Sequence, residues 1–307
     1  MSETTPPLAV VTGATAGLGL ATARGLAEQG YRVVIAGRRP DKGRIACDTL
    51  RRHRPDADVR FEPLDLDSLA SVRAFTRRLT ANEPRLACLI NNAGLMALPT
   101  RERTEDGFER QLGVNYLGHF LLTSRLLPLL FEESRQGKPA RVVQLSSLAH
   151  RSGRIDFEDL AGARRYDPWR AYRQSKLAML LFAQALQKRS DGGGWGLLSA
   201  AAHPGLSRTA LFDVGVRSRP LAGRLFKLVM PLLSQSADDG ARPTLYAALA
   251  NDVRGGDYYG PDGWGETRGQ PTRAYRSPAA RDPAVEDRLW QVSCELTGAT
   301  WATSPEL

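Results

Sequence analysis

Short apolar runs and longer amphipathic stretches follow one another along most of the chain. Runs of strand length lie at 8–11, 33–36, 59–64, 86–90, 142–145 and 196–202. Between and after these runs, polar and apolar residues at helical spacing predict helices near 20–30, 41–54, 68–79, 104–131, 168–188 and 283–297. Strands that alternate with helices of this length form parallel sheets with helices on both faces. The pattern therefore predicts an α/β fold with a single doubly wound parallel sheet.

No linker, repeat or low-complexity tract divides this alternation, so we expect one domain over residues 1–307. Residues 255–280 are rich in Gly, Pro, Arg and Tyr, which predicts a surface loop within a C-terminal extension, 255–307. Within 206–235, leucines recur at helical spacing, at Leu221, Leu225, Leu228 and Leu232. This segment is either a mobile lid over an apolar substrate or a helix packed on the core or on another subunit.

The charge pattern argues against several classes of partner. Lys and Arg outnumber Asp and Glu by 42 to 33, but the basic residues are scattered and form no stripe with interleaved aromatic residues. We therefore expect no nucleic-acid partner. The cysteines and histidines show neither CxxC nor HExxH spacing, so we expect no metal site. A polar N-terminus and a broken apolar stretch near 117–131 predict neither signal peptide nor membrane span, and hence a cytoplasmic protein.

A glycine-rich turn joins the first strand to the first helix, with the sequence Thr12-Gly13-Ala14-Thr15-Ala16-Gly17-Leu18-Gly19. At that position main-chain N–H groups and the helix dipole favour a pyrophosphate, as in Rossmann-type sheets. The spacing GxxxGxG is a variant of GxGxxG, and a glycine cluster by itself can also be a structural turn. The flanking strand and helix favour a dinucleotide site with contacts from Gly13, Thr15, Ala16, Gly17, Leu18 and Gly19.

The end of the second strand predicts which nucleotide binds. A carboxylate there would bind the ribose hydroxyls of NAD and repel a 2′-phosphate. This chain has Gly37 at that place, followed by Arg38 and Arg39. Guanidinium groups pair with phosphate in bidentate geometry, which favours NADP(H) over NAD(H). The alternative is that either arginine is an ordinary surface residue.

Tyr172 and Lys176 lie four residues apart in a predicted helix, so their side chains share one face. A nearby ammonium lowers the pKa of a phenol, which would suit Tyr172 to proton transfer. A YxxxK spacing alone is more often an exposed helical pair. Ser147 follows the strand at 142–145, where its hydroxyl can bind a substrate oxygen. Asn115 lies in an apolar stretch of the long helix and is either functional or a buried asparagine with satisfied hydrogen bonds.

Together these residues resemble the short-chain dehydrogenase/reductase family over nearly the whole chain. The resemblance rests on the motifs Thr12-Gly13-x3-Gly17-x-Gly19, Asn91-Asn92-Ala93-Gly94, Asn115, Ser147, Tyr172-x3-Lys176 and Pro204-Gly205. The chain is most similar to the retinol-dehydrogenase-like branch, through the stretches 114–120, 145–150 and 258–263. The family habit also implies a homo-oligomer.

The resemblance implies a role for each matching residue. Tyr172 is the acid/base, Lys176 lowers its pKa and holds the nicotinamide ribose, and Ser147 orients the carbonyl. Asn115 supports a proton relay. The remaining cofactor contacts that the resemblance implies are Asp65, Leu66, Asn92, Ala93, Gly94, Pro204, Gly205 and Thr209. The sequence departs from the family at Ser207, where many relatives have an apolar residue, which weakens the assignment of Thr209.

The predicted activity is an NADP(H)-preferring oxidoreductase that moves hydride between nicotinamide and a small molecule. The branch implies a lipophilic aldehyde, ketone or alcohol. Two alternatives stay open on the same fold, because a fold does not determine its chemistry. One is a non-redox biosynthetic enzyme for dehydration or cyclisation, and the other is a nucleotide-binding regulatory protein.

Overall fold

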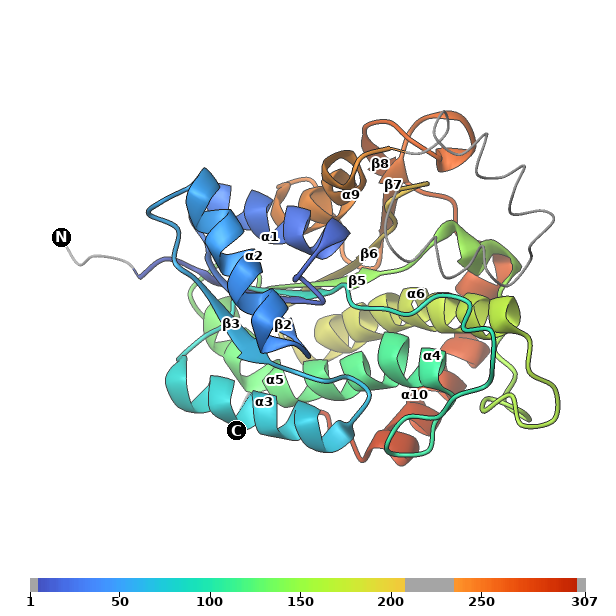
Figure 1. Ribbon diagram of the computed structural model, residues 1–307. Coiled ribbons are helices and arrows are strands. Elements are labelled where there is room, and N and C mark those ends of the chain that lie inside the picture. Colours follow the sequence, from blue (N-terminus) through green and yellow to red (C-terminus); the bar gives the residue numbers. More distant parts are fainter. Residues whose placement is uncertain (1–4, 208–234, 303–307) are drawn as a thin grey trace.

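The computed structural model describes residues 5–207 and 235–302. Its centre is one eight-stranded sheet in the order β3-β2-β1-β4-β5-β6-β7-β8 (Figure 1). Neighbouring strands run parallel from β3 to β7, and β8 pairs antiparallel with β7. The strands are β1 (Leu8–Thr12), β2 (Arg32–Gly37), β3 (Val59–Pro63), β4 (Cys88–Asn91), β5 (Arg141–Leu145), β6 (Leu198–Ala202), β7 (Tyr258–Pro261) and β8 (Pro271–Arg273). The predicted doubly wound α/β sheet is confirmed.

Helices cover both faces of this sheet (Figure 1). One face carries α1 (Gly17–Glu28), α2 (Pro40–His53) and α9 (Ala237–Leu249). The other carries α3 (Leu69–Asn82), α5 (Gly118–Ser134) and α6 (Pro168–Gly193), with α10 (Pro283–Thr297) packed against α5 and α6. In β1, Leu8 and Val10 enter one core, and Ala9 and Val11 enter the other. Because both faces are buried, the strand reads as an unbroken apolar run.

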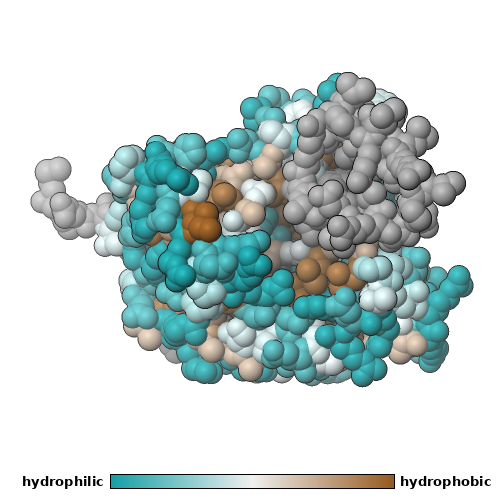
Figure 2. Space-filling model, viewed as in Figure 1, coloured by the Kyte–Doolittle hydropathy of each residue, from teal (hydrophilic) through white to brown (hydrophobic). Residues whose placement is uncertain are grey.

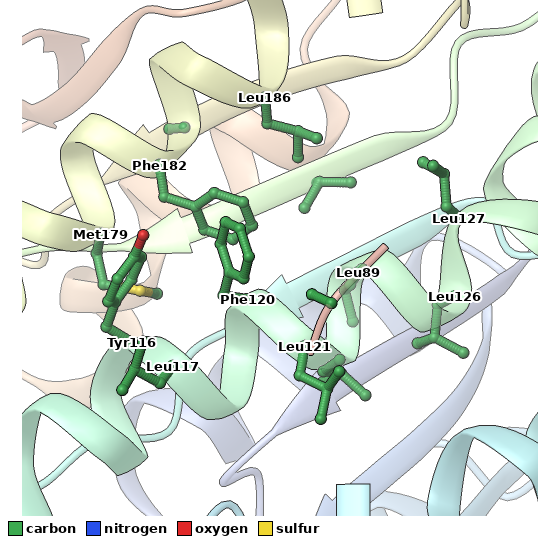
Figure 3. Packing of buried hydrophobic residues seen from close by; sticks show 14 of the residues in the cluster. Leu89, Tyr116, Leu117, Phe120, Leu121, Leu126, Leu127, Met179, Phe182 and Leu186 are labelled. Carbon is green, nitrogen blue, oxygen red and sulfur yellow. The ribbon is translucent and has the colours of Figure 1, made fainter. Parts of the chain in front are cut away.

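An aromatic cluster fixes α5 against α6. Figure 3 shows Phe120 and Phe182 facing one another between the two helices, with Tyr116 beside them. The ring centroids of Phe120 and Phe182 are 5.1 Å apart, and Trp290 of α10 meets Phe120 edge-on at 5.0 Å. Tilted and edge-on pairs add to the free energy gained from burial alone. The cluster therefore sets the spacing of the two helices that carry Asn115 and Tyr172.

The predicted helix at 104–131 differs from the structure at its start. Residues 104–109 form a turn in which Gly107 has a φ of +87°, a conformation that a helix cannot contain. The helix begins at α4 (Arg110–Leu112), passes through a π-helical turn, η1 (Gly113–Leu117), and continues as α5. Such π turns are rare and occur often at functional sites. Asn115 lies in the middle of this one.

The predicted surface loop at 255–280 is wrong for β7 and β8, which this stretch contributes to the sheet. Tyr258 and Tyr259 are almost fully buried, one in each core. Strands of three and four residues rich in Gly and Pro resemble loops in sequence. Burial of the two tyrosines outweighs that weak local preference.

The sequence analysis also assigned no element to α9, whose Gly240 and Pro243 weaken the helical pattern. The structure explains the glycine, because a Cβ at Gly240 would approach Leu18 of α1 to 2.7 Å and Ser207 still more closely. Gly240 thus lets α9 pack closely beside α1 and the end of β6. In the described parts of the chain, no helix combines the length and the apolar character that crossing a bilayer needs.

Candidate active site

The carboxyl ends of the central strands open into a cleft of about 710 Å³, a size typical of small-molecule sites. Figure 2 shows a hollow in this face of the molecule, where hydrophobic residues lie among polar ones. Most of the residues predicted from sequence line the cleft: Gly13, Thr15, Ala16, Gly17, Leu18, Gly19, Arg38, Arg39, Asp65, Leu66, Asn92, Ala93, Gly94, Ser147, Tyr172, Lys176, Pro204 and Gly205. Asn115 lies behind this lining, and Thr209 lies outside the described residues, as does nearly all of the segment 206–235.

The glycine-rich turn leaves its main chain open to the cleft. Gly13 and Gly17 have φ values of +66° and +57°, which favour glycine. A Cβ at Gly13 would lie 2.9 Å from the Cα of Ala93, so the turn packs directly on the loop after β4. Ala16, the N-cap of α1, makes no side-chain capping bond and the first turn has no acidic residue. The first N–H groups of α1 can therefore bind an anion, and this cradle fits a dinucleotide pyrophosphate.

Three cations gather where β2 ends. Arg38, Arg39 and Lys42 line the cleft, as does Asp65, two residues after β3. The Arg39 guanidinium forms an exposed ion pair with Asp41 at 3.5 Å. Sequence reasoning missed Lys42, although its place four residues after Arg38 in the first turn of α2 is a usable signal. The local charge is positive and suits a phosphate.

One face of α6 lines the opposite end of the cleft. Trp169, Tyr172, Arg173 and Lys176 recur at the i, i+3, i+4 and i+7 spacing, and all four border the cleft. The Lys176 ammonium donates a hydrogen bond to the Leu145 carbonyl at 2.9 Å. It lies 5.9 Å from the centre of the Tyr172 ring. The predicted convergence of phenol and ammonium on one site is therefore present.

The expected effect of Lys176 on Tyr172 is not what the structure shows. Burial raises the pKa of Tyr172 to about 12, and a hydrogen bond with the Ser147 hydroxyl only partly opposes that shift. Burial also lowers the pKa of Lys176 to about 8. Desolvation is thus the largest cause of both pKa shifts. The sequence predicted that the two side chains lie close together but not how strongly both are desolvated.

The two serines that follow β5 have different partners. The Ser146 hydroxyl donates to the Lys176 carbonyl at 2.7 Å and is buried. Ser147 is partly exposed, borders the cleft and accepts a hydrogen bond from the Ala149 N–H at 3.2 Å. Ser147 begins the short 3₁₀ turn η2 (Leu148–Ser152), which directs the hydroxyl toward Tyr172. The geometry therefore supports Ser147 over Ser146 as the substrate-facing hydroxyl.

Asn115 holds the loop after β4. Its Oδ1 accepts from the Leu95 N–H at 2.6 Å, and its Nδ2 donates to the Leu95 carbonyl and to the Ser175 hydroxyl. All its side-chain groups are satisfied, so its side chain acts as the buried structural asparagine that the sequence analysis kept open. A role in a proton relay stays a prediction.

His119, which sequence reasoning missed, links Asn115 to the phosphate turn. Its Nδ1 lies 2.9 Å from the Asn115 carbonyl and its Nε2 lies 2.8 Å from the Thr12 hydroxyl. Because a carbonyl only accepts, Nδ1 carries the proton and Nε2 accepts from Thr12. Burial lowers the pKa of His119 to about 3, so the ring stays neutral. The Thr12 hydroxyl in turn accepts from the N–H groups of Asn92 and Ala93.

Apolar side chains form the wall beyond Tyr172. Leu95, Met96, Leu148 and Trp169 border the cleft there, and the Trp169 ring meets the Tyr172 ring edge-on at 6.1 Å. Sequence reasoning did not find this wall, because its residues come from separate loops and from the start of α6. An apolar surface beside the phenol favours a hydrophobic substrate body.

A network around the buried His203 supports the turn at Pro204 and Gly205. The Gly205 N–H donates to Nδ1 of His203 at 3.1 Å, so Nε2 of His203 donates to Glu266 at 2.9 Å. Glu266 also pairs with Arg151 at 2.8 Å. The network thus ties the turn after β6 to η3 (Trp264–Glu266) and to η2. No sequence motif identified it.

Comparison with known proteins agrees with this geometry. A family model described as short chain dehydrogenase matches residues 7–214. This chain belongs to the short-chain dehydrogenase family. The match begins just before β1 and includes the glycine turn, Ser147, Tyr172 and Lys176. The predicted family is confirmed. The prediction of an oxidoreductase that acts on CH–OH and C=O groups is confirmed with it.

Within the family, the chain is similar to curated retinol and polyprenol dehydrogenases. It is 42% identical to mouse (Mus musculus) retinol dehydrogenase 12 over 296 residues, covering 95% of this chain and 86% of the relative. It is also 42% identical to mouse polyprenol dehydrogenase over 294 residues, with 95% and 84% covered. The resemblance to the retinol-dehydrogenase-like branch is thereby confirmed.

Solved structures share the fold of this chain. A crystal structure of a protein from Mycobacterium paratuberculosis matches with a TM-score of 0.78 and 40% identity, covering 97% of each chain. The NADP active-site complex of Pseudomonas aeruginosa RhlG matches with a TM-score of 0.65 and 26% identity, covering 82% of this chain and 93% of that one.

Proposed function

We propose that this short-chain dehydrogenase is an NADP(H)-preferring oxidoreductase that interconverts a lipophilic aldehyde or ketone and the corresponding alcohol. The observation that carries the proposal is that one cleft brings the two halves of such a site together. It joins the glycine turn and a cationic β2 end to Ser147, Tyr172 and Lys176. The names of the retinol and polyprenol dehydrogenases among its relatives support a lipophilic substrate.

The preference for NADP(H) rests on charge. Arg38 and Lys42 line the cleft, and position 37 is a glycine, so no carboxylate there repels a 2′-phosphate. A 2′-phosphate can form ion pairs with these cations, whereas a free ribose hydroxyl cannot. Gly37 is also small enough for Thr15 to approach, since a Cβ at Gly37 would lie 3.3 Å from the Thr15 methyl group. The adenosine end is thereby both narrow and positive. The NADP complex of a structural relative agrees with this preference.

The bound cofactor supplies the hydride chemistry. Tyr172 donates a proton to the carbonyl oxygen during reduction, and its raised pKa keeps the phenol protonated at neutral pH. Ser147 donates a second hydrogen bond to that oxygen and holds it near the phenol. The Leu145 carbonyl holds the Lys176 ammonium at the reacting end of the cleft. From there the ammonium can bind the ribose hydroxyls of the cofactor. During oxidation Tyr172 accepts the alcohol proton.

The test is consumption of NADPH and NADH across a panel of aldehydes and ketones, followed by absorbance at the nicotinamide band. We expect NADPH to be used with lipophilic carbonyls and NADH to be a poor substitute. Equal use of the two coenzymes would contradict the phosphate argument. Product formation that does not consume reduced nicotinamide would instead favour the non-redox alternative.

A further inference from the structure

The proposed function gives a role to most, but not all, of the charged residues that border the cleft. Among the described residues of the lining, the cations are Arg38, Arg39, Lys42, Arg173 and Lys176, and the acid is Asp65. Three of the cations belong to the adenosine end, where Asp65 also lies. Lys176 belongs to the reacting end. Arg173 is left without a role.

Arg173 borders the cleft beside the phenol. It follows Tyr172 in α6 and lies one helical turn after Trp169, so the three residues belong to the same cleft-lining stripe. Every other residue from 171 to 180 is buried, whereas Arg173 is partly exposed. Its side chain therefore lies at the substrate side of the cleft and in contact with solvent.

The guanidinium of Arg173 has no partner among residues 5–207 and 235–302. Nearby arginines that point elsewhere are paired: Arg170 with Asp156, and Arg151 with Glu266. The side chain of Arg173 makes no hydrogen bond and no ion pair with the described residues. A partly buried guanidinium with five N–H donors and no acceptor gains most from a ligand that supplies one.

The surroundings of Arg173 make the site selective for an anion on an apolar body. Leu148, Trp169 and Met96 supply apolar surface in the same cleft, and Met96 and Trp169 pack with the neighbouring Tyr172. Asp65, the acid of the described lining, lies at the other end of the cleft. With two cations and no described carboxylate in the lining of the substrate end, the local potential is positive. A carboxylate matches the planar fork of a guanidinium in bidentate geometry.

We propose that Arg173 forms an anion subsite, so that the substrate of this enzyme is an amphipathic carbonyl compound with a carboxylate group. This inference rests on the proposed function and makes its substrate class narrower. The apolar body lies along Met96 and Trp169, the carbonyl oxygen meets Tyr172 and Ser147, and the carboxylate pairs with Arg173.

The experiment compares a medium-chain ω-oxo carboxylic acid with its methyl ester, which has the same carbonyl and the same apolar chain. We expect the unmodified enzyme to use the acid with a kcat/KM about tenfold above that of the ester, chiefly through a lower KM, as a charge-assisted pair predicts. Arg173→Gln removes that preference and leaves the ester unaffected. Arg173→Lys restores part of it, because a point charge replaces the bidentate fork.

Arg170→Gln is the matched control, since it removes a guanidinium from the same helix outside the cleft lining and should change neither substrate. NADPH affinity, followed by nicotinamide fluorescence, should be the same in all variants. Equal use of acid and ester by the unmodified enzyme would overturn the subsite. The subsite would also be overturned if Arg173→Gln lowered kcat/KM equally for acid and ester, or if it weakened NADPH binding.

Calorimetry separates failure of the subsite from failure of the proposed function. The same acid and ester are titrated into the NADPH-saturated Tyr172→Phe variant, because this binding measurement does not require turnover. Tighter binding of the acid than of the ester, lost in the Arg173→Gln/Tyr172→Phe double variant, supports the subsite even if the unmodified enzyme reduces no carbonyl. Equal binding of acid and ester overturns it, whatever the unmodified enzyme catalyses.

Discussion

In the half of the cleft next to β1, α1 and β2, a ligand meets main-chain N–H groups of the glycine turn together with Arg38, Arg39 and Lys42, which follow β2 directly in sequence. In the half next to β5, η2 and α6, they are side chains that come from three separate segments of the chain. The first half, here the phosphate half, depends on local backbone conformation. The second half, here the catalytic half, depends on how distant elements pack. Substitutions should therefore affect the two halves in different ways.

The largest expected effect lies in the catalytic half. Tyr172→Phe keeps the ring and its contact with Trp169 but removes the proton that reduction needs. We expect kcat to fall by about 10³-fold, within the range for a general acid. NADPH affinity, measured by fluorescence, should stay unchanged, because the phosphate half is intact. If the variant kept most of its turnover, the assignment of Tyr172 would be wrong.

In the phosphate half, Arg38→Asp should exchange attraction for repulsion at the 2′-phosphate. We expect kcat/KM for NADPH to fall by about ten- to a hundredfold, the range for a hydrogen bond to a charged group, while that for NADH changes little. Arg44→Asp is the control, because Arg44 is exposed on α2 and does not border the cleft. A similar loss in both variants would mean that the general charge of α2 matters, and not a contact at Arg38.

A pH profile tests how the catalytic half treats its phenol. Oxidation needs the phenolate of Tyr172, and with a pKa of about 12 its fraction rises about tenfold for each pH unit below that value. We therefore expect kcat/KM for alcohol oxidation to increase with pH through the alkaline range, whereas reduction stays nearly flat near neutrality. An oxidation profile that is already level at neutral pH would show that Lys176 lowers the pKa of Tyr172 once cofactor is bound.

The smallest expected effect concerns His119, which joins the two halves. His119→Phe keeps an aromatic ring, a larger one, but removes the hydrogen bonds that the imidazole makes with the Thr12 hydroxyl and the Asn115 carbonyl. We expect the free energy of unfolding in urea to fall by about 1–3 kcal/mol, the cost of unsatisfied buried groups. His53→Phe, on the exposed end of α2, is the control and should be nearly neutral. Equal stability of the two variants would contradict a linking role for His119.

The two halves also differ in how well the sequence predicts them. The glycine turn and the alternation of strands and helices from β1 to β6 follow from local patterns, and both were predicted. Tyr172 and Lys176 were placed correctly because four residues make one turn of any helix. Their desolvation was not predicted, because it depends on Met96, Ala97 and Ala149, which lie far from α6 in sequence, as well as on Trp169 of the same helix.

Some features carry no sequence signal that periodicity can detect. The π turn around Asn115 differs from an α-helix by a single residue per turn, so the hydrophobic pattern does not reveal it. The strands β7 and β8 are too short to show alternation. Arg173 is one of many arginines in a basic chain, and its contact with the cleft becomes visible only when α6 is in place.

The outer strands of the sheet limit how copies of this chain can associate. At one margin, β3 has the charged Arg60 and Glu62 and ends at Pro63; at the other, β8 begins with Pro271 and ends with the exposed Arg273. Charges and prolines on short terminal strands prevent a neighbouring molecule from extending the ladder of main-chain hydrogen bonds. If the predicted homo-oligomer forms, its interface must therefore be built from helices or loops, and fibrous growth through the sheet is disfavoured.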